Sequence, residues 1–110
     1  MAQDGHVVII TTTGSREEAR RLARGLVEER LAACVQMTPV DSVYEWKGEV
    51  QEDAEILLFI KTRRDRYADV EACLRRHHSY EVPEILAVPV EAGLADYLAW
   101  VDGRTAGGTD

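Results

Sequence analysis

The chain has 110 residues, a length that suits a single domain with one hydrophobic core. Its 13 basic and 20 acidic side chains give a formal net charge of -7, which argues against nucleic acid or an anionic membrane as the partner. The longest apolar runs, 56–60 and 85–90, are too short to span a bilayer, and residues 1–5 lack the basic and apolar pattern of an export signal. We therefore expect a soluble, cytoplasmic protein that binds neither nucleic acid nor membrane.

The first predicted elements are a strand and a helix. Residues 6–13 are almost all β-branched and stop at Gly14, a pattern typical of a central strand buried on both faces. Ser15 and Glu18 fit a capping box, and the apolar residues that follow recur at helical spacing. The predicted inward positions of this helix are Ala19, Leu22, Ala23, Leu26 and Val27.

A long β-hairpin is predicted next. Residues 31–37 have an extended pattern, Pro39 requires either a bulge or an edge strand, and the strand resumes at Val40. Lys47-Gly48 supplies the turn, because glycine readily adopts a positive φ. The return strand then runs from about Glu49 to Ile60.

This hairpin is too long for the domain that carries it. A strand from Val50 to Ile60 would extend roughly 37 Å at about 3.4 Å per residue, whereas a compact domain of this size has a radius of gyration of about 13 Å. We expect the hairpin to project from its own subunit. Tyr44 and Trp46 lie near its tip, and exposed aromatic side chains there predict an interface with a partner.

The second predicted helix ends at a polar junction. Thr62 can cap this helix with Asp65 at its third position, and the predicted inward residues are Tyr67, Val70, Cys73 and Leu74. Pro83 forbids a continuing helix, so the helix must end near His78. Residues 77–85, His-His-Ser-Tyr-Glu-Val-Pro-Glu-Ile, therefore connect a helix to a strand and hold the densest set of polar side chains in the chain.

The last predicted elements are a strand over 85–90 and a short helix after Gly93. The helix should place Leu94, Tyr97, Leu98 and Val101 inward. Residues 103–110 contain no large apolar side chain, and we expect a disordered tail there. The order β-α-β-β-α-β plus a terminal helix predicts one α+β domain over 1–102 with the ferredoxin-like, split βαβ plan.

Five separate segments resemble the CutA divalent-cation tolerance proteins. They are residues 26–35 (LVEERLAACV), 44–49 (YEWKGE), 61–62 (KT), 78–85 (HSYEVPEI) and 97–100 (YLAW). Together they extend the resemblance over nearly all of the chain from Val7 to Val101, in matching order and spacing. The resemblance implies a ferredoxin-like homotrimer, built like the PII signalling proteins, that takes part in the response to metal ions and binds copper. Some bacterial members have a cysteine, proposed as a copper ligand, at the end of the first strand, where this chain has Thr11.

The candidate metal ligands are His78, Glu81, Glu84 and His77. An imidazole with carboxylates suits Cu(II) or another divalent metal, but the two glutamates could equally be surface charges. Adjacent helical residues point about 100° apart, so the two histidines cannot face one small pocket in a continuous helix. His78 matches the junction motif and is the favoured ligand, while His77 suits a solvent-exposed helix end.

The cysteines have simpler interpretations. Cys34 and Cys73 lie far apart and form no CxxC motif, which indicates neither a disulfide framework nor a zinc knuckle. We expect buried free thiols, because each lies in an apolar pattern.

Three functional classes remain open. The first is a metal-binding trimer involved in divalent-cation tolerance. The second is a PII-like module that binds a small anionic ligand between subunits, with Lys61 and Tyr80 as ligand contacts and Arg63 and Arg64 at a helix N-terminus. The third is an enzyme that uses Cys34 with His78, or His78 with Glu81. We favour the first and do not expect an enzyme or catalytic residues, because the sequence has no nucleophile elbow, phosphate loop or HExxH motif.

Overall fold

The computed structural model describes residues 5–106. Its elements are β1 His6–Thr13, α1 Arg16–Glu28, β2 Cys34–Trp46, β3 Glu49–Arg63, the 3-10 helix η1 Arg64–Arg66, α2 Tyr67–His77, β4 Leu86–Pro89 and α3 Ala95–Thr105. The four strands form one antiparallel sheet in the order β2-β3-β1-β4. This order places β3 between β1 and β2, which is the split βαβ arrangement. The predicted α+β, ferredoxin-like fold is confirmed.

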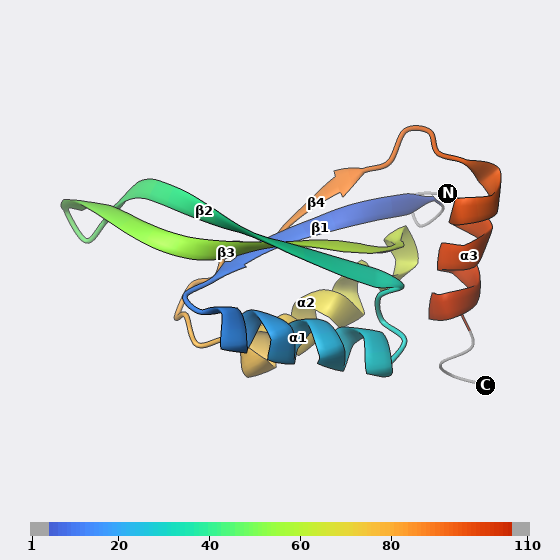
Figure 1. The fold of residues 1–110 in the computed structure, drawn as a ribbon, viewed down its shortest axis with the longest axis horizontal. Helices are drawn as coiled ribbons and strands as arrows, with labels where there is room; N and C mark the ends of the chain where they lie inside the picture. The colour runs from blue at the N-terminus through green and yellow to red at the C-terminus, as the bar shows by residue number, and fades with distance from the viewer. Residues whose placement is uncertain (1–4, 107–110) are drawn as a thin grey trace.

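Helices α1 and α2 lie on the same face of the sheet (Figure 1). The core is formed between them by alternate residues of the two central strands, including Val7, Ile9, Leu58 and Ile60, together with Leu26 of α1. The opposite face is uncovered, and Val8 and Ile10 are only half-buried there. The prediction that the first strand is buried on both faces is therefore wrong for one copy of the chain, because α1 and α2 pack on the other face and α3 reaches only one end of this one, where Asp102 bonds His6.

The β2–β3 hairpin extends away from the body of the domain, as predicted (Figure 1). The molecule measures 44 × 26 × 23 Å along its principal axes. The pairing of β2 with β3 keeps one register from Cys34 opposite Lys61 to Trp46 opposite Glu49. Pro39 does not break the pairing of β2 with β3, because β2 is an edge strand. Of the two predicted alternatives, the edge strand is therefore confirmed and the bulge is not.

The hairpin turn matches the predicted residues. Lys47 has a φ of 54° and Gly48 a φ of 86°. Two consecutive residues with positive φ give a turn whose twist matches that of the flanking strands. The carboxylate of Glu45 also accepts a hydrogen bond from the Gly48 N–H at 2.7 Å, which fixes the turn.

One predicted helix cap is absent from the structure, and the other is confirmed only in part. Thr62 does not cap α2, because β3 continues to Arg63 and the Thr62 hydroxyl donates to the Leu31 carbonyl at 2.7 Å. Ser15 does cap α1, since its hydroxyl accepts a hydrogen bond from the Glu18 N–H. The Glu18 carboxylate, however, bonds Ser79 instead of returning to Ser15.

The apolar stripes of the helices are largely as predicted, with three exceptions. Val27 on α1, Leu94 before α3 and Tyr97 on α3 are exposed, although all three were expected to face inward. Val101 of α3 is buried as expected. No helix within residues 5–106 is long and apolar enough to cross a membrane.

The C-terminal helix continues beyond its predicted end. The predicted tail began at Gly103, yet α3 runs to Thr105, and the Thr105 side chain is fully buried. The Thr105 carbonyl accepts hydrogen bonds from Arg63 and Arg66, while Arg30 donates to the carbonyls of Gly103 and Ala106. These contacts supply the missing partners of the last helical turn. The prediction of a disordered tail is therefore wrong for Gly103 to Ala106, and residues 107–110 lie outside the described part of the chain.

Both cysteines are free thiols, as expected. Cys73 is buried, and this burial raises the pKa of its thiol. Cys34 is only half-buried at the start of β2, so the prediction of a fully buried thiol does not hold for it.

Candidate functional site

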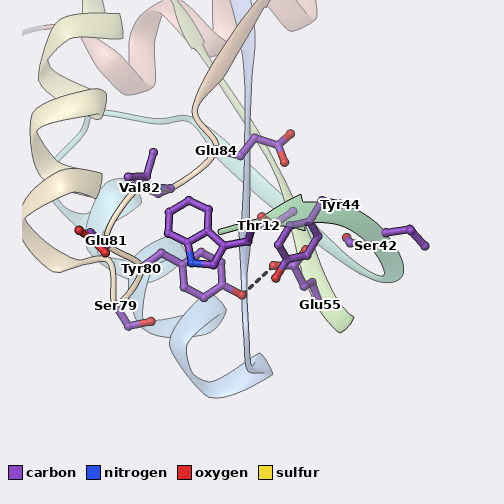
Figure 2. A pocket seen from close by; sticks show the side chains of 12 residues that line it. Thr12, Ser42, Tyr44, Glu55, Ser79, Tyr80, Glu81, Val82 and Glu84 are labelled. Atoms are coloured by element: carbon purple, nitrogen blue, oxygen red, sulfur yellow. Dashed lines mark hydrogen bonds between the residues drawn. The ribbon is translucent and has the colours of Figure 1, made fainter. Parts of the chain in front are cut away.

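A cleft lies between the hairpin and the junction that follows α2. Its volume is about 780 Å³, which falls in the range of small-molecule sites. Figure 2 shows the junction residues Ser79 to Glu84 along one side and the hairpin residues Ser42 and Tyr44 along the other. The predicted site residues Tyr44, Trp46, Tyr80, Glu81 and Glu84 all line this cleft.

Glu55 is the deepest acidic residue in the cleft. It lies on β3, its carboxylate is almost fully buried, and it accepts a hydrogen bond of 2.7 Å from the Tyr80 hydroxyl (Figure 2). Burial, followed by this bond to Glu55, raises the pKa of the Tyr80 phenol well above its usual value. Tyr80 therefore keeps its proton and acts as a donor. The sequence analysis missed Glu55, because its apolar neighbours in β3 gave it no distinguishing pattern.

A second tyrosine–carboxylate pair lies on the hairpin. The Tyr44 hydroxyl donates to Asp53 across β2 and β3, with 2.5 Å between the oxygens. This bond is the main reason that the pKa of Tyr44 is raised. Beyond it, the Lys47 ammonium lies 5.6 Å from the centre of the Trp46 ring, which shows that this ring already contacts a cation.

The conformation of the junction depends on His78 and Glu18. The Nδ1 atom of His78 accepts a hydrogen bond from the Tyr80 N–H at 3.1 Å, and its Nε2 atom lies 2.8 Å from the Thr12 carbonyl. Since a carbonyl oxygen can only accept, Nε2 must carry the proton. Glu18 accepts bonds from both the N–H and the hydroxyl of Ser79, at 2.9 and 3.0 Å. The two residues therefore anchor the start of the junction to β1 and α1.

The environment of His78 bears on the predicted metal site. Its side chain is fully buried, and both ring nitrogens already have partners. His77 is exposed at the end of α2 and does not line the cleft, while Glu81 and Glu84 are exposed at the cleft. Within residues 5–106, no group of three His, Cys, Asp or Glu side chains is placed to hold a metal ion. Copper binding stays a prediction, but His78 does not fit it in this conformation, because ligation would require it to give up the bond from Tyr80.

The residues predicted for an anionic ligand are not brought together. Tyr80 lines the large cleft beside Glu55, whereas Lys61 lies six residues further along β3, roughly 20 Å away. Lys61 donates to Gln36 and lines a separate, smaller pocket of about 240 Å³ near α3. Arg63 pairs with Asp65 and bonds the Thr105 carbonyl. The helix that follows, η1, has only three residues and offers no N-terminal anion site.

The first of the two residue pairs suggested for an enzyme, Cys34 with His78, is also apart. Cys34 lies opposite Lys61 at one end of the sheet. His78 bonds Thr12, whose partner on β3 is Leu57, four residues away from Lys61. A thiol and an imidazole so placed cannot act as nucleophile and base.

Together, the fold and the cleft define a small ferredoxin-like protein with a projecting hairpin and an acidic, aromatic cleft. The family model of the CutA1 divalent ion tolerance protein matches residues 7–104. The divalent-cation tolerance protein CutA of Thermus thermophilus is 44% identical over 99 residues, which cover 89% of this chain and 96% of that protein. The chain belongs to the CutA1 divalent ion tolerance protein family.

Two further relatives extend the comparison. The chloroplastic protein CutA of Arabidopsis thaliana is 42% identical over 100 residues, covering 90% of this chain but only 55% of that longer protein. The structure of the periplasmic divalent cation tolerance protein CutA from Archaeoglobus fulgidus superposes with a TM-score of 0.90 at 39% identity, covering 91% of this chain and 98% of that one. These names contradict the predicted cytoplasmic location, because one relative is chloroplastic and another periplasmic.

Proposed function

We propose that this protein is a homotrimer that acts in the response to divalent metal ions, by binding and not by catalysis. The observation that supports assembly is the uncovered face of the sheet. The relatives' names, divalent-cation tolerance proteins, support the physiological role. The number of copies follows from the resemblance to the CutA family.

The uncovered face is apolar across three strands. We call it the open face, and its apolar members are Val8, Ile10, Leu57, Phe59, Leu86 and Val88, which are cross-strand partners with side chains on the same side. Leu86 and Val88 are 55% and 46% exposed in one copy of the chain. A contiguous apolar surface of this kind is typical of a protein interface. In the proposed assembly, a second copy of the chain covers this face.

Light scattering tests the assembly. We expect a particle mass close to three times the chain mass of 12.3 kDa, and a mass of one chain at micromolar concentration would contradict the proposal. Trp46→Ala should weaken the assembly on dilution, because buried aromatic side chains often dominate interfaces. Val50→Ala is the matched control, since Val50 is an exposed apolar residue of the same hairpin.

The response to metals is tested in cells that lack their own CutA protein. Expression of this chain should restore growth at raised copper concentration, and failure to do so, with the protein present and assembled, would contradict the proposed role. Calorimetry with Cu(II) separates the two histidines. His78→Ala should abolish binding if the junction is the site, whereas loss of binding only in His77→Ala would place copper on the exposed end of α2.

A further inference from the structure

The strands of the open face carry opposite charges at their two ends. Basic side chains stand at the end near α3, and acidic side chains stand toward the hairpin. By strand register they are His6, Lys61 and Arg63 at the first end, and Glu49, Asp53 and Glu55 at the second. Unlike charges at the two ends of one surface favour contact between the first end of one copy and the second end of another.

Lys61 differs from the two other basic residues of this face. Each of those has a carboxylate partner in its own chain. Lys61 donates instead to the neutral amide oxygen of Gln36, and no ion pair within residues 5–106 includes it. Its ammonium group therefore has no carboxylate partner in the described part of one copy.

Glu55 is the acidic counterpart at the other end. It is 7% exposed in one copy, and its hydrogen bond comes from the neutral Tyr80 phenol. None of the basic side chains in the described chain forms an ion pair with it. Because an unpaired buried charge costs free energy, a cation from another molecule would stabilise this carboxylate.

One chain cannot join these two residues. Six residues of the extended strand β3 separate them, which corresponds to roughly 20 Å. In a ring of three copies, each contact joins two different patches of the chain, one from each neighbour. The two ends of the open face are two such patches, and their charges are complementary.

The apolar side chains of the two ends also suit a contact. Trp46 and Val82 line the cleft that contains Glu55, and both are exposed in one copy. At the other end, Tyr97 lies beside Lys61 and contacts Trp100, and both aromatic rings are exposed. Apolar groups that exclude water around an ion pair strengthen it, and aromatic side chains are common at the centre of interfaces.

We propose that Lys61 of one copy enters the cleft of the next copy and pairs with Glu55 beside Tyr80, so that the site is built from two chains. The inference rests on the proposed trimer and adds which surfaces of neighbouring copies meet. Lys61 and Tyr80 are far apart in one chain, and this contact brings them together.

A double-mutant cycle tests the pair. Glu55→Gln and Lys61→Gln each remove one charge, and the first retains an oxygen that can accept the Tyr80 bond. Each should raise the protein concentration at half-dissociation by about tenfold or more, because it leaves the other charge buried without a partner. The double variant should be no weaker than the weaker single variant. Light scattering on dilution at a fixed urea concentration gives the measurement, and effects that simply add would overturn the proposal.

Two matched controls remove the same charges elsewhere. Glu52→Gln removes a carboxylate from an exposed position of β3 on the opposite face of the strand. Arg20→Gln removes a positive charge from an exposed position of α1. Neither should change the dissociation. If all four single variants weaken the assembly alike, net charge and not this pair is responsible, and the proposal is wrong.

Reversal of both charges gives an independent readout. Glu55→Lys alone and Lys61→Glu alone should each abolish the trimer, because each places like charges in every contact. Both changes in one chain should restore the trimer, since every contact then joins unlike charges again. A folded double variant that stays dissociated would overturn the proposal. Should Glu55→Lys fail to fold, the milder glutamine cycle still decides the outcome.

The particle mass of the parent protein keeps the two proposals separate. A parent trimer in which Glu55 and Lys61 show no coupling refutes this pairing and leaves the proposed assembly intact. A parent monomer at micromolar concentration refutes the assembly itself.

Discussion

Two buried threonines on adjacent central strands differ in whether their hydroxyl groups have a partner. Thr62 on β3 donates to the Leu31 carbonyl, whereas the Thr11 hydroxyl on β1 has no hydrogen-bond partner although its side chain is fully buried. A buried hydroxyl without a partner loses its bonds to water and gains none in return. The Thr11 hydroxyl therefore makes no stabilising contact within the described part of the chain.

Thr11→Val should therefore stabilise the protein. The change keeps the shape of the side chain and removes the unpaired hydroxyl, with an expected gain of about 1 kcal/mol in the free energy of unfolding. Thr62→Val is the matched control and should cost about 1 kcal/mol or more, because it leaves the Leu31 carbonyl without its donor. Urea unfolding of both variants gives the measurement. A destabilised Thr11→Val protein would show that the hydroxyl has a partner.

Tyr80 gives the protein a predictable response to alkaline pH. Its pKa is raised in the folded state, chiefly by burial and by the bond to Glu55. Folding thus favours the protonated phenol, so this contribution to stability is complete below the unfolded pKa of about 10 and declines as the pH rises above it. Tyr80→Phe lacks the titrating group. The stability advantage of the parent over Tyr80→Phe should be constant near neutral pH and shrink above about pH 10 in denaturant titrations, and an advantage that grows there would contradict the assignment.

At the scale of elements, the end of α3 is held in place by polar contacts, because its sequence has few apolar side chains to bury. Residues 103–106 are Gly-Arg-Thr-Ala, and no pattern there predicts burial. The carbonyls of the last turn nevertheless accept hydrogen bonds from Arg30, which follows α1, and from Arg63 and Arg66 at the end of β3 and in η1. Arg30 reaches them from a left-handed backbone conformation with a φ of 62°, which is unusual for a residue other than glycine.

Removal of residues 103–110 should consequently destabilise the protein. The deletion eliminates the buried Thr105 and the acceptors of three guanidinium groups. Hydrogen bonds to charged groups contribute about 1.5–3 kcal/mol each when buried, and we expect a fall in melting temperature of more than about 5 °C. Removal of residues 107–110 alone is the control. Equal melting temperatures for the two truncated proteins would show that residues 103–106 do not contribute to stability.

At the scale of the whole molecule, the open face and the hairpin are two surfaces that one copy leaves uncovered. The helices α1 and α2 occupy only one side of the sheet, and α3 lies at the end of the sheet opposite the hairpin tip (Figure 1). One chain therefore has a single packed core on one side and an apolar face on the other. The proposed assembly would complete the burial of the sheet.

A charge on the open face should prevent assembly. Val88→Glu places a carboxylate among the apolar residues of β4 and its neighbours, where association would bury it without a partner. Val27→Glu is the matched control, because Val27 is exposed to a similar extent, 42% against 46%, on the solvent side of α1. We expect the first variant to scatter light as a smaller particle and the second to keep the parent mass. A trimer of unchanged stability in Val88→Glu would show that the open face is not the interface.

The sequence determined the order and type of the elements, because local signals specify them. The β-branched run of residues 6–13, the Lys47-Gly48 turn and Pro83 each restrict the backbone through their own geometry. Those restrictions alone produced the ferredoxin-like plan, the projecting hairpin and the junction after α2. Tyr80, Glu81 and Glu84 were likewise identified from the density of polar groups in one short segment.

The tertiary structure decided which of these groups meet and which are buried. Glu55 is polar in an apolar strand, and only the approach of Tyr80, 25 positions away, makes it part of a cleft. His78 is the favoured metal ligand from its match to the junction motif, but packing against Thr12 and Tyr80 occupies both of its nitrogens. The local sequence predicts that Glu18 completes a capping box with Ser15, but its carboxylate accepts two hydrogen bonds from Ser79 instead. Periodicity and spacing describe neighbours along the chain, whereas desolvation and hydrogen bonding between distant segments depend on the completed fold, and these fixed the chemistry of the site.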